Sequence, residues 1–163
     1  MKLKISPCLW FDQQAEQASR FYTSIFPDSR IMRTTHYGEA GHEIHGKPAG
    51  SVLTVVFELA GQPFTALNGG PIFQFNEAIS LQVFCEDQAE INHYWEKLGE
   101  GGDPAAQQCG WLKDRFGLSW QIVPVQLSEM LASGDYAQTE RIMTALLGMH
   151  KLEIAQLQQA YAG

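Results

Sequence analysis

The apolar and polar positions of the chain form a pattern that occurs twice. In residues 3–26, an apolar run leads to an acidic residue and then to apolar residues at helical spacing. The same order returns 74 positions later (88 minus 14), where Gln88-Ala89-Glu90 repeats Gln14-Ala15-Glu16. A repeat of this kind predicts a fold built from two similar units, each of which opens with a buried strand and an amphipathic helix.

In the first unit, the predicted strand is Leu3–Phe11 and the predicted helix is Gln13–Phe26. Asp12 lies between them and is expected to cap the helix with its carboxylate. The Gly-rich stretch 38–50 predicts a loop. Three further segments are rich in β-branched or aromatic residues and predict strands: residues 30–37, 52–60 and 63–67. The last two are expected to be joined by a turn at Gly61-Gln62.

In the second unit, the predicted strand is Ile79–Cys85 and the helix after it is expected to end near Leu98. Asp87 and Glu90 have the spacing of a capping box at the start of this helix. A short strand is expected around residues 101–107, although its pattern is weak. Two clearer strands, turned by Asp114–Gly117, follow at residues 109–113 and 118–123.

Each unit is thus predicted as a βαβββ module, and the fold class as α+β. One such module would leave an apolar sheet face exposed, so we expect two of them to pair into a cupped mixed sheet, within the chain or swapped between chains. The predicted boundaries are residues 1–125 for the paired modules (about 3–70 and 79–124) and 126–163 for a helical C-terminal extension. Helices in this extension are expected near residues 128–132, 137–148 and 152–161.

The charge and composition narrow the class of protein. The formal net charge of −7, without any basic run, disfavours nucleic-acid binding. No apolar stretch approaches the ~20 residues of a membrane span, and the N-terminus is too polar for a signal peptide. Three cysteines without CxxC spacing argue against a disulfide framework or a zinc knuckle. We therefore expect a cytoplasmic protein that does not bind nucleic acid or membranes.

Several motifs carry a family resemblance. They include Leu9-Trp10-Phe11-Asp12 and Phe21-Tyr22 in the first unit, and Asp114–Ile122 in the second, where Asp, Gly and Trp are spaced D-x-x-G-x-x-W. Together with the paired modules, they resemble the vicinal oxygen chelate superfamily, which includes glyoxalase I, extradiol dioxygenases and bleomycin-resistance proteins. Other segments are similar to its PhnB-like branch, often labelled 3-demethylubiquinone-9 3-methyltransferase: residues 66–70, 75–80 and 109–114.

The resemblance implies a divalent metal held by His or Glu side chains on the first and last strands of each module. Aligned on the acidic turns, these positions hold Ile5, Thr65, Ser80 (or Ile79) and Gln121. Aliphatic side chains do not bind metals, and a neutral amide is a weak ligand, so we predict no metal site there. The alternative is a displaced divalent-metal site in the histidine-rich loop, at His36, His42 and His45.

We expect the cup to bind a small, flat or aromatic molecule. Its predicted ligand-binding residues combine neutral hydrogen-bonding groups with aromatic walls: Thr65, Asn68, Ser80, Gln82, Trp111, Trp120 and Gln121. Trp10, Phe73 and Phe75 are further candidates for apolar walls.

Other kinds of catalysis find little support in the residue pattern. Cys8 and Cys85 fall in predicted strands, where buried thiols are common packing residues, and no His or Asp is placed to activate Cys109. The glycine-rich segment 98–103 follows a helix, which predicts a helix C-terminal connection instead of a nucleotide-binding loop.

The leading functional hypothesis is a small-molecule-binding protein of the glyoxalase and bleomycin-resistance type, homodimeric, with a metal-free cup. The alternative is an enzyme of the superfamily acting on a small, quinone-like or aromatic substrate. It would be a metal-assisted lyase, isomerase or dioxygenase, or the labelled 3-demethylubiquinone-9 3-methyltransferase. The catalytic residues of such an enzyme are not identified by the sequence.

Overall fold

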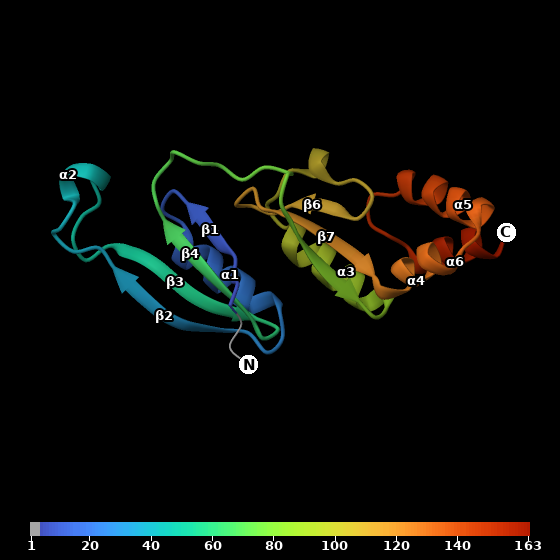
Figure 1. The fold of residues 1–163 in the computed structure, drawn as a ribbon, viewed down its shortest axis with the longest axis horizontal. Coiled ribbons are helices and arrows are strands. Elements are labelled where there is room, and N and C mark those ends of the chain that lie inside the picture. The colour runs from blue at the N-terminus through green and yellow to red at the C-terminus, as the bar shows by residue number, and fades with distance from the viewer. Residues whose placement is uncertain (1–3) are drawn as a thin grey trace. The chain divides into compact units, whose positions relative to one another are not determined.

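The computed structural model of the chain describes residues 4–163 and is shown in Figure 1. The chain forms two compact units, one that ends at Phe75 and one that spans Asn76–Gly163. Each unit has its own small mixed sheet, of four strands in the first and three in the second. The predicted α+β class with two tandem modules and a helical C-terminal region is therefore confirmed.

The sheet of the first unit has the order β1-β4-β3-β2, in which β1 runs parallel to β4 and the other pairs are antiparallel. Strand β1 begins only at residue 8, whereas the predicted strand began at Leu3, which lies outside the described residues. Pro7 precedes it and has no N–H to donate to the ladder. The strands are β1 (Cys8–Phe11), β2 (Arg30–His36), β3 (Val52–Leu59) and β4 (Gln62–Asn68).

Helix α1 (Ala15–Ile25) covers one face of this sheet and supplies the core of the first unit. Its inward positions repeat at helical spacing, and Tyr22 is fully buried against Phe57 with ring centroids 6.3 Å apart. Phe57 in turn stacks on Phe64 at 5.4 Å. Successive strand residues point to opposite faces, so the face away from α1 is left open.

The N-terminus of α1 is capped by a residue from β4, so the prediction that Asp12 caps it is wrong. The N-cap position is Gln14, and no side chain of the helix's own N-terminal segment caps it. Instead, the Asn68 carbonyl oxygen accepts a hydrogen bond from the Ala15 amide at 2.9 Å. The Asn68 amide nitrogen donates to the Val52 carbonyl oxygen at 3.0 Å. One side chain thus ties α1, β3 and β4 together.

The hairpin between β3 and β4 turns one residue earlier than predicted. Leu59 pairs with Gln62, which leaves Ala60 and Gly61 as the two turn residues. Both have positive φ, 47° and 78°, as a type I′ turn requires. Gly61 adopts its positive φ without strain, and this glycine is the reason that a turn was predicted here.

The loop between β2 and β3 contains one short helix, α2 (His42–His45), between two left-handed glycines, Gly41 and Gly46. The ends of the loop are joined by backbone bonds, from the Tyr37 amide to the Ser51 carbonyl and from the Gly50 amide to the Tyr37 carbonyl, both at 2.8 Å. The loop is therefore anchored at its base.

The second unit has the sheet order β5-β7-β6, with β5 parallel to β7 and β6 antiparallel to it. Helix α3 (Gln88–Gly99) packs on one face. The strands are β5 (Ser80–Cys85), β6 (Trp111–Lys113) and β7 (Ser119–Pro124). Asp87 caps α3 through the Glu90 amide, but the Glu90 carboxylate returns to the Glu86 amide, so only half of the predicted capping box forms.

The strand predicted around residues 101–107 is absent, and a short 3-10 helix, η1 (Pro104–Ala106), stands in its place. Asp103 caps it by accepting from the Ala105 amide at 2.9 Å. A Cβ added to Gly102 would lie 2.0 Å from the Lys113 carbonyl oxygen, so this segment lies close against the end of β6. Proline and this close approach explain the loss of the strand.

The turn between β6 and β7 is held by a buried aspartate. Asp114 is 3% exposed, and its carboxylate accepts hydrogen bonds from the Phe116 amide, the Leu118 amide and the Trp120 indole. Their lengths are 2.8, 3.1 and 2.8 Å, respectively. The predicted D-x-x-G-x-x-W spacing therefore describes a structural turn.

The C-terminal helices are α4 (Val125–Ser133), α5 (Tyr136–Leu147) and α6 (Ile154–Ala162). They share a core of Leu127, Ile142, Met149, Leu152 and Leu157. The Cys109 and Gly110 amides donate to the Met149 and His150 carbonyls at 2.8 Å, which joins this region to the base of β6. None of the helices in residues 4–163 has the length and apolar character that crossing a membrane would require.

Candidate functional site

The open face of the second sheet gathers several of the predicted ligand-binding residues. Along β7, Trp120 and Ile122 are buried on the α3 side, so Gln121 points to the opposite face. The register of the sheet places Gln82 on one side of Gln121 and Trp111 on the other. These three residues form a row across the open face, which we call the Gln121 row.

Hydrogen bonds link the Gln121 row to the neighbouring serine. The Gln121 amide nitrogen donates to the Ser80 hydroxyl at 2.7 Å, and its carbonyl oxygen accepts from the Gln82 amide at 3.4 Å. The hydroxyl of Ser119, on the same face of the sheet, is buried and has no hydrogen-bond partner within residues 4–163. Because this oxygen is shielded from solvent, a ligand on the open face would contact Ser80, Gln82 and Gln121 instead.

Two of the predicted ligand-binding residues lie on neither open face. Trp120 is 2% exposed, and its indole nitrogen is committed to Asp114. Asn68 is buried in the first unit, where both ends of its amide are used to cap α1 and to hold β3. We therefore assign structural roles to both side chains.

On the first sheet, Thr65 belongs to the open face, together with Trp10 and Cys8. The register pairs Cys8 with Thr65, while Ile5 precedes β1 and is 85% exposed. The residue opposite Thr65 is thus Cys8, three positions later in the chain than the Ile5 that the alignment on Asp12 predicted. Trp10 is fixed by a 2.8 Å bond from its indole to the Gly70 carbonyl and by an edge contact with Phe73.

The paired first and last strands therefore present Cys8 with Thr65 in one unit and Gln82 with Gln121 in the other. These positions differ by the repeat offset of 74 between Cys8 and Gln82. Of these four side chains, only the Cys8 thiol belongs to a strong ligand type for a transition metal, and the two amides already bond to each other. The donor set does not fit the metal that the superfamily implies.

The histidines of the β2–β3 loop do not form a ligand cluster either. Within residues 4–163, no three His, Cys, Asp or Glu side chains are grouped so that they could hold a metal. The His45 ring lies 4.6 Å from the Tyr37 ring, and its Nδ1 accepts from the Lys47 amide at 2.9 Å. His45 thus organises the loop.

The cysteines occupy different environments, and Cys85 is the most deeply buried. Burial, with a smaller effect of Glu90 and Asp87, raises the pKa of its thiol from 9.0 to about 12. The folded chain keeps this thiol protonated at pH values where the unfolded chain loses the proton. Its contribution to stability is therefore complete below pH 9 and is lost as the pH rises from 9 toward 12.

We expect the free energy of unfolding to fall between pH 9 and 10 by about 1 kcal/mol more in the native chain than in Cys85→Ala. Urea titrations at both pH values measure this difference in slope. The substitution also changes the packing, but that effect is the same at both pH values. An equal fall in the free energy of unfolding in the two proteins would contradict the raised pKa of Cys85.

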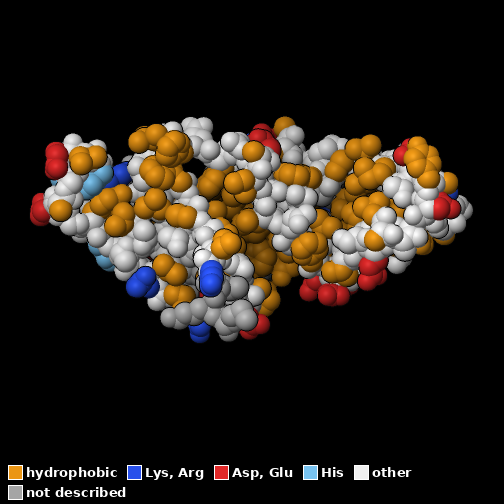
Figure 2. Space-filling model, viewed as in Figure 1, with side chains coloured by type: hydrophobic (Ala, Val, Ile, Leu, Met, Phe, Trp, Pro, Cys, Tyr) orange, Lys and Arg blue, Asp and Glu red, His pale blue; other side chains and the backbone are white. Residues whose placement is uncertain are grey.

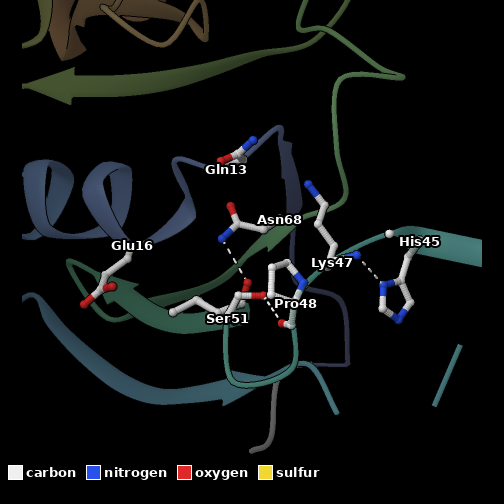
Figure 3. A pocket seen from close by; sticks show the side chains of 9 residues that line it. Gln13, Glu16, His45, Lys47, Pro48, Ser51 and Asn68 are labelled. Carbon is white, nitrogen blue, oxygen red and sulfur yellow. Dashed lines mark hydrogen bonds between the residues drawn. The ribbon is translucent and has the colours of Figure 1, made fainter. Parts of the chain in front are cut away.

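A separate cavity of about 530 Å³ lies in the first unit, and Figure 3 shows its lining side chains. Its walls come from the segment that opens α1, from the sheet and from the β2–β3 loop. Gln13 and Glu16 belong to the segment at the start of α1, and Asn68 belongs to the sheet. The loop contributes His45, Gly46, Lys47, Pro48 and Ser51.

In both units the first and last strands pair in parallel and a helix covers one face of the sheet, which is the arrangement that the resemblance to the vicinal oxygen chelate superfamily implied. Solved structures of low sequence identity share this fold. A Pseudomonas aeruginosa protein is 19% identical over 76% of this chain and 98% of its own, with a TM-score of 0.58. The fosfomycin resistance protein FosX from Mesorhizobium loti is 15% identical over 81% and 98%, with a TM-score of 0.53.

Residues 3–123 match the model of the 3-demethylubiquinone-9 3-methyltransferase family, and the chain belongs to this family. The PhnB protein from Bacillus cereus, which carries the same methyltransferase name, is 34% identical. The similarity covers 76% of this chain and 100% of the Bacillus cereus chain, with a TM-score of 0.64. A search of curated proteins gave no match.

Sequence reasoning missed the cavity in the first unit and its lysine. Lys47 stands in a Gly-rich stretch that predicts only a loop, and Gln13 in the turn before a helix. The two come together because the loop folds back to the start of α1, a contact that no local pattern encodes. The paired Gln82 and Gln121 could be found, because both lie in predicted strands at repeat-related positions.

Proposed function

We propose that the open face of the second sheet binds a small, uncharged, ring-shaped molecule that carries carbonyl or hydroxyl oxygens. The observation that carries this proposal is the Gln121 row, in which two amides and an indole stand across the sheet. Trp111 offers an aromatic surface against which a flat ring can stack. The chain would then be a metal-free small-molecule-binding protein of the glyoxalase and bleomycin-resistance type.

The hydrogen-bonding groups of this face suit a neutral ligand. Lys113, on the same face of β6 as Trp111, is neutralised by its ion pair with Glu77. The Ser80 hydroxyl accepts from Gln121 and keeps its own proton to donate. Quinones and related aromatic ketones offer the acceptor oxygens that such donors recognise.

We also propose that the protein is a homodimer in the cytoplasm. Phe84 on β5 is 55% exposed, and its place on the open face would suit an apolar partner surface. Hydrophobic side chains reach the surface of both units in the face that Figure 2 shows. A second copy could cover part of an open sheet face and enclose a bound ring.

The test is the binding of duroquinone, a fully methylated benzoquinone, to native protein and to Gln121→Leu by titration calorimetry. Loss of the amide removes hydrogen bonds that order Ser80 and Gln82, so we expect the dissociation constant to rise about tenfold. Gln156→Leu, an exposed position on α6, is the matched control and should bind as the native chain does. Equal binding by Gln121→Leu and the control would refute the assignment.

The second candidate is an enzyme, and the family's name favours methyl transfer to a quinone-like substrate. Such a reaction needs a methyl donor, and the glycine-rich segment 98–103 follows helix α3, packs against the end of β6 at Gly102 and opens no α-helix. Metal analysis of protein purified without chelators separates the metal-assisted reactions from simple binding. Stoichiometric nickel, zinc, manganese or iron would overturn the metal-free reading.

A further inference from the structure

The Lys47 ammonium group lies in the cavity of the first unit and makes only long contacts with its neighbours. The Lys47 side chain is only 16% exposed, yet its amine lies 3.8 Å from the nearer Asp12 carboxylate oxygen and 3.4 Å from the Asp12 carbonyl oxygen. Charge-assisted bonds of an ammonium group are usually 2.7–2.9 Å long. The Lys47 amine therefore retains the capacity to bind a closer, negatively charged acceptor.

The other polar groups that line the cavity are largely committed. Both ends of the Asn68 amide are used, and the Ser51 hydroxyl donates to the Pro48 carbonyl at 2.6 Å. The Glu16 carboxylate bonds to Arg20 at 2.7 Å, which offsets its charge. This leaves the Lys47 amine and the exposed Gln13 amide as the donors that face a ligand.

The arrangement of these groups gives the cavity a polar end and an apolar wall. In Figure 3, the Lys47 amine points toward Gln13 and Asn68, whereas the Glu16 carboxylate points away from it. The ring of Pro48 and the side chain of Val52 also line the space. A volume of about 530 Å³ lies within the ~300–1,000 Å³ range of small-molecule pockets.

We infer that this cavity is a second ligand site, which takes a small organic carboxylate with a compact apolar body. The carboxylate accepts hydrogen bonds from the Lys47 amine and the Gln13 amide. The apolar body packs on Pro48 and Val52. This ligand differs in charge from the neutral ring proposed for the second unit, and the two sites share no residue.

The loop holds Lys47 in position before any ligand arrives. His45 accepts from the Lys47 backbone amide and its ring packs at a tilt against Tyr37, whose hydroxyl donates to the Asn68 backbone carbonyl at 2.6 Å. His45 and Tyr37 are thus positioning residues, and Lys47 supplies the positive charge that the ligand contacts. A preformed site loses less entropy when it binds.

The test compares benzoate with benzamide, which has the same shape without the charge, by two-dimensional NMR on ¹⁵N-labelled full-length protein. We expect benzoate to shift the amide resonances of Gln13, Lys47 and Val52, and benzamide to bind at least tenfold more weakly. Lys47→Met should weaken benzoate binding at least tenfold, because it removes the charge and keeps the aliphatic stem. Lys47→Arg should restore most of it.

Lys97→Met, on the exposed side of α3, is the matched control and should bind benzoate like the native chain. The dispersion of the NMR spectrum reports directly whether each variant is folded. Native affinity of Lys47→Met for benzoate, or shifts confined to residues outside the cavity, would overturn the proposal. Duroquinone binding should be unchanged in Lys47→Met, so failure of one site is distinguishable from failure of the other.

Discussion

Replacing Asp114 by alanine is expected to lower the free energy of unfolding by about 4 kcal/mol. The substitution leaves three donors, two backbone amides and the Trp120 indole, without an acceptor in a turn where the side chain is 3% exposed. Each buried donor that loses its partner costs roughly 1–3 kcal/mol. Urea unfolding followed by circular dichroism and tryptophan fluorescence measures the loss.

Two companion substitutions sharpen this result. Asp114→Asn keeps an oxygen for the backbone amides but sets an amide group against the indole N–H, so its loss should be smaller than that of alanine. Asp103→Ala removes a single bond, to the Ala105 amide at the surface, and should cost about 1 kcal/mol or less. Equal losses for Asp114→Ala and Asp103→Ala would show that the carboxylate does not organise the turn.

Replacing Asn68 by alanine is expected to cost about 3 kcal/mol in the first unit. The side chain is 7% exposed and bonds to the Ala15 amide and the Val52 carbonyl, so its loss uncaps α1 and frees the start of β3 together. Asn68→Asp should recover part of the loss, because it still accepts from Ala15. Thermal and urea unfolding measure both effects.

Asn76→Ala is the matched control for this experiment. Asn76 also accepts a backbone hydrogen bond, from the Ala78 amide at 2.9 Å, but it lies exposed after the first unit and joins no two elements. Its substitution should change the free energy of unfolding by less than about 1 kcal/mol. If Asn68→Ala were as mild as Asn76→Ala, the bridge between α1 and the sheet would contribute little.

The sequence predicted most elements of the fold because their patterns are local. The helical spacing of Ala15, Ala18 and Tyr22 and the β-branched run of β3 locate elements to within one or two residues. The cap of α1 could not be found this way, since Asn68 lies 53 residues beyond Ala15. A nearby Asp12 is a sound local candidate, and the tertiary contact overrides it.

The residues of the candidate sites also differ in whether a local pattern or a tertiary contact determines their position. Gln82 and Gln121 emerge from the repeat, because equivalent strands bring equivalent positions opposite each other. The other positions depend on the pairing register of the strands, which the sequence does not reveal. The structure shows that Cys8, and not Ile5, lies beside Thr65. Trp120 looks like a wall residue by type alone, and only its bond with Asp114 reveals that it supports the turn.

The Gln121 row also bears on how this sheet can evolve. Glutamine codons lie one base away from glutamate and from histidine codons, so Gln82 and Gln121 each stand a single mutation from a strong metal ligand. The two side chains already face each other on paired strands, and exchanging them leaves the buried residues of β5 and β7 untouched. Two such substitutions would therefore place two metal-ligating side chains beside each other on this sheet without any change in its architecture.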